Sequence, residues 1–187
     1  MAKVIIRDAR LAFPDVFEAV QYKGQGPFQY RSTFLIPTGD KQKTDIDAVI
    51  EQVAKDKWGA KADAVLKQIF AAGNKCCWVS GDTKDYNGYA GNWALTATRN
   101  QDDGRPVVVG RSKTQPIAPS DGKIYSGAYV NGIVEVWAQD NSFGKAIRAT
   151  LSTVQWVKDG ESFGGAAPAS ADGLDDLGSD FDDDDLL

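Results

Sequence analysis

Hydrophobic and polar residues alternate through most of the chain, which is the pattern typical of β-strands. Successive side chains of a strand point to opposite faces, so a strand with one buried face is apolar at every second residue. Residues 126–139 give the clearest case, because their even positions are mostly alanine and valine. The same pattern, with turn residues between the runs, predicts strands over residues 3–13, 28–36, 75–80, 89–99, 106–111, 126–139 and 145–157. We expect Pro14 to end the first strand.

Residues 42–72 follow a helical period instead. Apolar side chains recur there at spacings of three and four, first after Thr44 and again over residues 61–71. Thr44 is suited to cap the first helix, and Gly59 and Gly73 follow the two runs as helix-ending residues. A helical insertion in an otherwise β chain favours a small antiparallel barrel over a doubly wound α/β fold.

Charge is distributed unevenly along the 187 residues. The chain carries 21 basic and 26 acidic side chains, a formal net charge of −5. Residues 166–187 hold eight of the aspartates and no lysine or arginine, which leaves residues 1–165 with a net charge of +3. The acidic segment has too little apolar surface to offset its chain entropy, so we expect one domain over 1–165 and a disordered tail over 166–187. A basic body with an acidic tail indicates binding to nucleic acid and to a protein partner.

Several classes of protein are excluded by what the sequence lacks. It contains no histidine and only two cysteines, Cys76 and Cys77. Hydrolases with an imidazole base and histidine-ligated zinc sites are therefore excluded, and we expect no metal or other cofactor. Adjacent cysteines close no useful loop, so we interpret them as buried thiols. Charged residues follow the amino terminus closely, which predicts neither a signal peptide nor a membrane span.

Aromatic residues on strand faces that should be wet are the first candidates for contact with nucleic acid. Trp137 and Tyr129 occupy odd positions of residues 126–139, opposite the apolar face. A nucleobase stacked on such a ring contributes about 1–3 kcal/mol, as measured by alanine substitution. Trp137 is explained as well by packing under the helical insertion or in a dimer interface. Both interpretations stay open.

A second aromatic group lies in residues 84–99, where Tyr86, Tyr89 and Trp93 fall close to basic residues. The glycines between them allow close approach of the backbone to a ligand. Trp93 shares its strand face with Leu95, so we expect it in the core. Tyr86 and Tyr89 lie in or next to a loop, and we expect them to stack on bases.

Basic residues flank several of the predicted strands. Contacts to phosphates need cations but no fixed spacing, so each of these residues is a candidate phosphate contact as well as an ordinary solvated charge. The candidates are Arg31, Arg99, Arg105, Arg111 and Lys113.

The end of the tail sets isolated apolar residues among carboxylates. This segment consists of Phe181, Asp182, Asp183, Asp184, Asp185, Leu186 and Leu187. It can bind a basic, apolar-lined pocket of a partner, or lie in the domain's own basic groove and compete with nucleic acid. A tail that serves only solubility is the alternative, although such a tail gains nothing from two terminal leucines.

Three stretches resemble the phage single-stranded DNA-binding proteins that combine an OB-fold with an acidic C-terminal tail. These stretches are residues 30–37, residues 125–165 and the Asp-rich terminus. The resemblance implies a five-stranded OB-fold barrel that binds single-stranded DNA (ssDNA) without sequence preference. It also implies a role in phage DNA replication, recombination and repair, in the cytoplasm of the infected bacterial host.

The same resemblance bears on individual residues. Trp137 matches an aromatic position that stacks on bases in such relatives, and the tail matches a segment that engages a polymerase or a helicase. Leu186 and Leu187 depart from the pattern, because relatives often end in phenylalanine. This departure affects the identity of the partner more than the existence of one.

Two other classes of function were weighed against DNA binding. Clustered carboxylates would serve a metal-dependent nuclease, but the available aspartates fall in turn-like contexts where aspartate is favoured for backbone hydrogen bonding. These residues are Asp82, Asp85, Asp102 and Asp103. A virion structural or assembly protein is the other alternative. We expect a binding protein rather than an enzyme, and a homodimer is consistent with the short site of one barrel.

Overall fold

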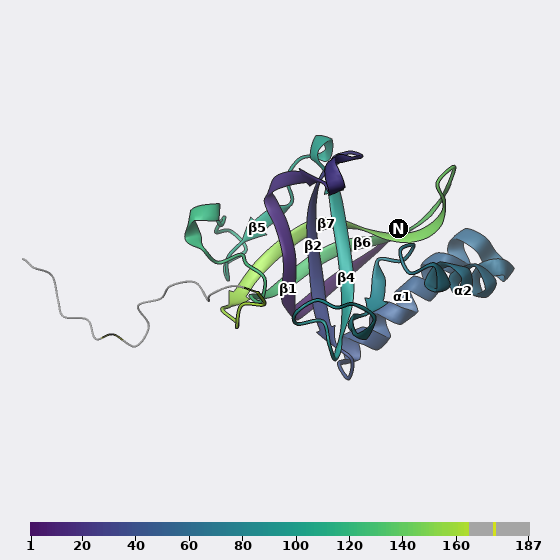
Figure 1. Ribbon diagram of the computed structural model, residues 1–187, viewed down its shortest axis with the longest axis horizontal. Coiled ribbons are helices and arrows are strands. Elements are labelled where there is room, and N and C mark those ends of the chain that lie inside the picture. Colours follow the sequence, from purple (N-terminus) through teal and green to yellow (C-terminus); the bar gives the residue numbers. More distant parts are fainter. Residues whose placement is uncertain (165–173, 175–187) are drawn as a thin grey trace, which may run out of the picture.

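A computed structural model describes residues 1–164 and residue 174 (Figure 1). All seven predicted strands and both predicted helices are present. The strands are β1 (Ala2–Gln21), β2 (Phe28–Pro37), β3 (Trp78–Ser80), β4 (Asn92–Asn100), β5 (Val107–Val109), β6 (Tyr129–Asn141) and β7 (Gly144–Lys158). The helices are α1 (Lys41–Trp58) and α2 (Ala62–Ala72).

Five of the strands close into a barrel. Neighbouring strands pair in the order β3-β4-β2-β1-β6-β7-β5, and β4 also pairs with β7. This closing contact is parallel and runs through Thr98 and Thr150, whereas the other four pairings of the ring are antiparallel. The ring β1-β2-β4-β7-β6 confirms the expected mainly β fold, an OB-fold-like barrel with one helical insertion.

β1 differs most from its prediction, because it does not end at Pro14. It continues to Gln21, and its pairing with β2 shifts register on both sides of Asp15. Bulges of this kind bend a strand and are one of the few places where a strand accommodates proline. Phe13 takes a φ of 47° next to the proline. Residues 22–27 therefore connect β1 to β2, a shorter connection than the predicted strand boundaries at residues 13 and 28 imply.

The barrel interior confirms the alternation seen in the sequence. Along β6, Val130, Val134 and Val136 are buried. The residues at the alternate positions are only half-buried, namely Tyr129, Asn131, Ile133, Glu135 and Trp137. Phe34 of β2 is fully buried, and a Cβ added to Gly132 would lie 2.5 Å from its ring. Glycine at that position of β6 therefore makes room for the aromatic core residue.

Trp78 joins the barrel to the helical insertion. Its ring is fully buried and lies 5.2 Å from the ring of Trp93, centroid to centroid. Its Nε1 donates a hydrogen bond of 2.9 Å to Oδ1 of Asp47 on α1. Trp93 packs against the core from a half-buried position, close to its prediction. Just before β3, Cys77 is a buried thiol as expected, whereas the thiol of Cys76 is only half-buried.

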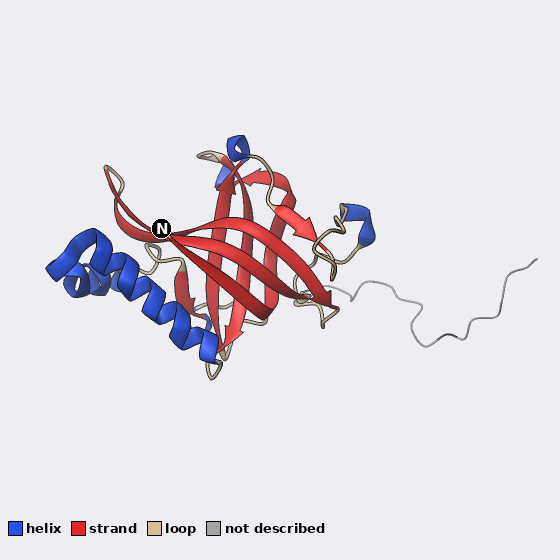
Figure 2. Ribbon diagram, turned by 180° about the vertical axis from the view of Figure 1, so that it is seen from behind, coloured by secondary structure: helices blue, strands red, loops and turns tan. Residues whose placement is uncertain are grey.

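The two helices lie together on one side of the barrel, beside the end of the β6–β7 hairpin that carries its turn (Figures 1 and 2). α1 begins at Lys41, earlier than predicted, because Asp40 rather than Thr44 caps it. Oδ1 of Asp40 accepts a hydrogen bond of 2.9 Å from the backbone N–H of Gln42. The apolar faces of both helices extend the core with Ile46, Ile50, Val53, Val65, Leu66 and Ile69.

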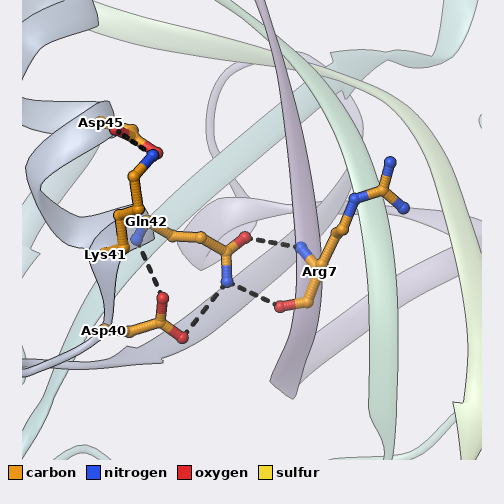
Figure 3. A network of polar contacts seen from close by, with 5 residues as sticks. All are labelled: Arg7, Asp40, Lys41, Gln42 and Asp45. Carbon is orange, nitrogen blue, oxygen red and sulfur yellow. Dashed lines mark hydrogen bonds and ion pairs between the residues drawn. The ribbon is translucent and has the colours of Figure 1, made fainter.

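Gln42 fastens the start of α1 to an irregular part of β1 (Figure 3). Its Oε1 accepts a hydrogen bond of 2.7 Å from the backbone N–H of Arg7, and its Nε2 donates one of 2.9 Å to the backbone oxygen of Arg7. The pairing of β1 with β6 shifts register here, between Ile6 and Ala9. One amide side chain thus satisfies both backbone groups of a residue that the bulge removes from the ladder.

Candidate nucleic-acid interface

Polar side chains follow the outer sides of β2 and β4, where Thr33 is fully buried and its neighbours Arg31, Thr96 and Thr98 are half-buried. Arg31 lies across from Thr98, and Thr33 from Thr96, in the register of the two strands. The hydroxyl groups of Thr33 and Thr96 share a hydrogen bond of 2.9 Å. At the end of the strands, Nε2 of Gln29 donates to Oδ1 of Asn100 at 2.8 Å. We call this surface the β2–β4 face, defined by Gln29, Arg31, Thr33, Thr96, Thr98 and Asn100.

Arg31 places a cation in the middle of the β2–β4 face. Asp15 of β1 is its partner in the strand register. Burial raises the pKa of the Asp15 carboxyl, and the nearby Arg31 guanidinium acts in the opposite direction. The Nε atom of Arg31 is buried and has no hydrogen-bond partner among the described residues. That buried donor is out of reach of a ligand, but the guanidinium as a whole is half-buried and its positive charge is suited to an anionic ligand.

Aromatic residues gather at one end of this face. The ring centroids of Phe13 and Tyr86 are 5.2 Å apart, and those of Tyr86 and Tyr89 are also 5.2 Å apart. Tyr89 is only 5% exposed and packs on Leu35 and Ala94, whereas Tyr86 is 53% exposed. Burial raises the pKa of the Tyr89 hydroxyl. Tyr89 is therefore a packing residue that contacts β2 and β4, and Tyr86 is the tyrosine whose ring remains accessible to a base.

Tyr129 stands at the same end of the barrel, with cations against its ring. The guanidinium carbon of Arg10 lies 4.8 Å from the Tyr129 centroid and 4.5 Å from that of Phe163, and Nζ of Lys158 lies 4.6 Å from Tyr129. Arg10 also donates hydrogen bonds of 2.7 and 2.6 Å to the backbone oxygens of Gly127 and Glu161. The Tyr129 ring thus takes part in cation–π contacts rather than presenting two open faces.

Trp137 lies apart from the other predicted stacking residues. It is eight residues from Tyr129 on β6, about 26 Å along the strand. β6 pairs with β1 and β7 and has no pairing with β2 or β4. Trp137 is half-buried opposite Arg148 of β7, and its Nε1 donates a hydrogen bond of 3.1 Å to Oγ1 of Thr150. The structure therefore divides the predicted stacking residues between two places.

The predicted phosphate contacts are also divided. Arg99 donates hydrogen bonds to the backbone oxygens of Gly104, Asp103 and Leu151 at 2.8, 2.7 and 3.4 Å, so its guanidinium holds the turn after β4. Arg111 donates to the backbone oxygen of Val157 at 3.3 Å. The side chains of Arg105 and Lys113 are exposed on the segments that flank β5. Of the five candidates, only Arg31 lies on the β2–β4 face.

Comparison with known proteins identifies the family of the chain. A family model described as Enterobacter phage Enc34, ssDNA-binding protein, matches residues 2–187. The chain belongs to this family. Putative protein p50 of Acyrthosiphon pisum secondary endosymbiont phage 1 is 43% identical over 180 residues, with 94% of each chain covered.

Solved structures agree with this assignment to the Enc34 family. The ssDNA-binding protein from bacteriophage Enc34, solved in complex with ssDNA, has 27% sequence identity and a TM-score of 0.71, over 87% of this chain and 89% of that chain. The ssDNA-binding protein gp2.5 encoded by bacteriophage T7 has 16% identity and a TM-score of 0.52, over 95% and 98% of the two chains. The T7 protein shares the fold. The expected resemblance to phage ssDNA-binding proteins is confirmed at the level of the family.

Several exposed aromatic residues on the strands and loops of this Enc34-family chain were missed from the sequence. Phe13, Tyr22, Phe28 and Phe143 are 45%, 66%, 48% and 80% exposed. The alternation assigned Phe13 and Phe28 to strands, but one lies at a bulge and the other at the first residue of β2. Both stand next to a proline, and that neighbour was the available signal. Tyr22 and Phe28 lie at the β1–β2 connection, the end of the β2–β4 face opposite Tyr86.

Other expectations concern the tail, metals and membranes. Residues 181–187, predicted to bind a partner, lie outside the described residues.

Among residues 1–164 and 174, no group of three or more Asp, Glu or Cys residues could hold a metal ion. Asp82, one of the carboxylates weighed for a nuclease, accepts a hydrogen bond of 2.8 Å from the backbone N–H of Gly91. Neither helix in this part of the Enc34-family chain is long and apolar enough to cross a membrane.

Proposed function

We propose that the protein binds ssDNA without sequence preference along the β2–β4 face. The observation that carries the proposal is the placement of Arg31 between two groups of exposed aromatic residues. Tyr22 and Phe28 lie at the start of β2, and the rings of Phe13 and Tyr86 cluster with Tyr89, which packs on Leu35 toward the end of β2. The distance along β2 from residue 28 to residue 35 is about 23 Å at 3.3 Å per residue. Strands 2 and 3 of an OB-fold barrel, here β2 and β4, are the usual nucleic-acid face of that fold.

Physical chemistry favours loose recognition on this face. Every base has a π-face, so stacking on exposed aromatic rings is tolerant of sequence. A guanidinium attracts the phosphate that every nucleotide carries. The hydroxyl and amide groups of Thr33, Thr96, Gln29 and Asn100 already pair with one another, which leaves them poorly suited to read base edges.

The biological part of the proposal rests on the family. We propose that the protein acts on phage DNA during replication, recombination and repair in the host cytoplasm. The acidic tail would bind a replication protein such as a polymerase or a helicase, and would compete with DNA when no partner is present. A homodimer, which would lengthen the site, stays a prediction.

Fluorescence anisotropy of end-labelled DNA tests the binding proposal directly, because no tryptophan lies among the residues that define the β2–β4 face. Labelled oligo(dT) and a labelled duplex of equal length are each titrated with the protein, and the complex is then dissociated with salt. A saturable rise in anisotropy with oligo(dT) alone, reversed by salt, is the expected result. No response to either DNA would remove ssDNA binding from consideration and return attention to a virion protein.

Replacing Arg31 by glutamine is expected to reduce the salt dependence of ssDNA binding. Loss of one phosphate contact lowers the slope of log affinity against log salt by about 0.7 for a single strand. The slope is measured by fluorescence titration between low and physiological salt. Lys57→Gln on α1, away from the β2–β4 face, is the matched control and should leave the slope unchanged. An unchanged slope for Arg31→Gln would contradict its role in phosphate binding.

Replacing Trp137 by alanine is expected to have an effect that depends on the length of the DNA. Trp137 lies outside the β2–β4 face, so only a strand that continues around the barrel can reach it. Affinity for an oligonucleotide of about 6 nucleotides should stay constant, and affinity for one of about 30 should fall, since OB-folds cover about 4–16 nucleotides each. Fluorescence anisotropy with labelled DNA gives both affinities. Equal losses for both lengths would place Trp137 in the primary site.

A further inference from the structure

A pocket opens where the described chain ends, next to the aromatic end of the β2–β4 face. Its volume is about 550 Å³, and its walls include Phe13, Tyr86 and Phe163. A second pocket of about 450 Å³ adjoins it across Asn87 and Phe163, and Arg10 lines this second pocket. We call the two together the exit pocket, because Gly164, the last residue described before the tail, borders both.

Phe13 is held in the exit pocket by a strained backbone. Its φ of 47° lies in the left-handed region, which residues with a side chain adopt at a cost. Its backbone N–H donates a hydrogen bond of 3.2 Å to Oγ of Ser126, and the register of β1 shifts at this point. The ring remains 45% exposed, so burial does not repay the strain. Strained residues that expose a functional group are typical of ligand-binding sites.

The exit pocket itself is well supported. Phe163 packs against Gly88, where an added Cβ would lie 2.6 Å from the Phe163 ring. Nδ2 of Asn87 donates a hydrogen bond of 3.0 Å to the backbone oxygen of Phe163, and the Phe163 N–H donates one of 3.1 Å to the Ser126 oxygen. A wall fixed from two sides can receive a ligand without rearranging, which lowers the entropic cost of binding.

The side chains that line the exit pocket are suited to contact one nucleobase. Phe13 and Tyr86 meet edge to face at 78°, so a flat ring can stack on one of them and contact the edge of the other. Ser126 and Asn87 add hydrogen-bonding groups in the same pocket. Arg10, held between Tyr129 and Phe163, lines the adjoining space together with Glu161, and Asp85 lines the larger pocket. The two carboxylates offset the charge of Arg10, so the aromatic walls match an uncharged base rather than a phosphate.

We infer that the exit pocket binds one unstacked nucleobase of ssDNA against Phe13 and Tyr86. The inference rests on the proposed function and locates one base of the bound strand. It assigns Phe13 a direct contact with DNA, which neither its place in a strand nor its apolar character indicated. This site would also place the DNA next to Gly164, the last described residue before the acidic tail.

Photochemical crosslinking of the full chain tests this assignment. Oligo(dT) that carries 5-iodouracil at one position is bound, irradiated and mapped by mass spectrometry. We expect crosslinks on the peptides that contain Phe13 and Tyr86. Crosslinks confined to Tyr22, Phe28 or Trp137 would overturn the exit pocket as a base site while leaving ssDNA binding intact. Absence of both crosslinks and any anisotropy change with oligo(dT) would remove the proposed function together with this inference.

Matched substitutions give a second measurement. Phe13→Leu keeps the backbone conformation and an apolar side chain, but removes the aromatic face, so ssDNA affinity should fall about tenfold. Tyr86→Leu, at an exposed position, should have a similar effect. Phe70→Leu on α2 is the control, because Phe70 is 46% exposed, close to the 45% of Phe13. Unchanged affinity for both pocket variants would contradict the assignment. Tighter binding by Phe13→Leu would show that the pocket seats the tail's own Phe181 and would equally overturn it.

Discussion

Removing negative charge from the tail is expected to tighten ssDNA binding about tenfold or more at low salt. The variant replaces Asp182, Asp183, Asp184 and Asp185 by asparagine in the full chain. The tail is covalently joined to residues 1–165, which have a net charge of +3. Its local concentration near the β2–β4 face is therefore in the millimolar range or higher. A polyanion at that concentration competes with the phosphates of DNA. Fluorescence titration of wild type and variant with oligo(dT) measures the difference.

Salt separates this competition from other effects of the substitution. Screening shortens the reach of the charges from about 10 Å at 0.1 M to about 3 Å at 1 M, so the two affinities should converge as salt rises. Gly178→Asn with Ser179→Asn is the control, because it adds asparagine beside the same segment without changing its charge. Equal affinity of the charge variant and wild type at low salt would exclude competition by the tail.

Replacing Trp78 by alanine is expected to lower the free energy of unfolding by about 3–5 kcal/mol. Trp78 is fully buried, packs against Trp93 and donates its indole hydrogen to Asp47 on α1. The substitution therefore leaves a large cavity and removes the donor of Oδ1 of Asp47, whose Oδ2 still pairs with Lys43, and it loosens the helical insertion. Urea denaturation followed by circular dichroism gives the loss of stability.

Trp137→Ala serves as the control for this loss. Its indole also donates one hydrogen bond, to Thr150, but Trp137 is only half-buried. The cost should therefore be well below that of the Trp78 substitution. A loss below about 1 kcal/mol for Trp78→Ala would mean that the core refills the space, contrary to the tight packing of protein interiors.

The parts of the fold that were predicted correctly depend on local patterns. The valines of β6 alternate with polar residues, and the pattern alone assigned Val130, Val134 and Val136 to the core. The helical insertion was equally clear, because its apolar spacing differs from that of a strand. In both cases the residues that decide the structure lie within a few positions of one another.

The parts that were missed depend on contacts between distant residues. Nothing near Pro14 shows that β1 continues, because the bulge is stabilised by pairing with β2 and by Ser126. The sequence treated Tyr86 and Tyr89 as equivalent, yet only Tyr89 is covered by Leu35 and Ala94. Arg99 is indistinguishable from any surface cation in the sequence, but two carbonyl groups of the turn after β4 and one of β7 surround it in the structure.

The parallel contact between β4 and β7 also bears on the order in which the protein folds. The hairpin of β6 and β7 joins strands that are adjacent in sequence, with thirteen paired positions that need only a short loop to form. The contact of β4 with β7 has one such position, and the Arg99 to Leu151 hydrogen bond beside it spans 52 residues. Closing so long a loop costs entropy before it returns much contact. We therefore expect the β6–β7 hairpin to form early and the ring to close late, since closure also needs the pairing of β1 with β6, which joins residues still farther apart in sequence.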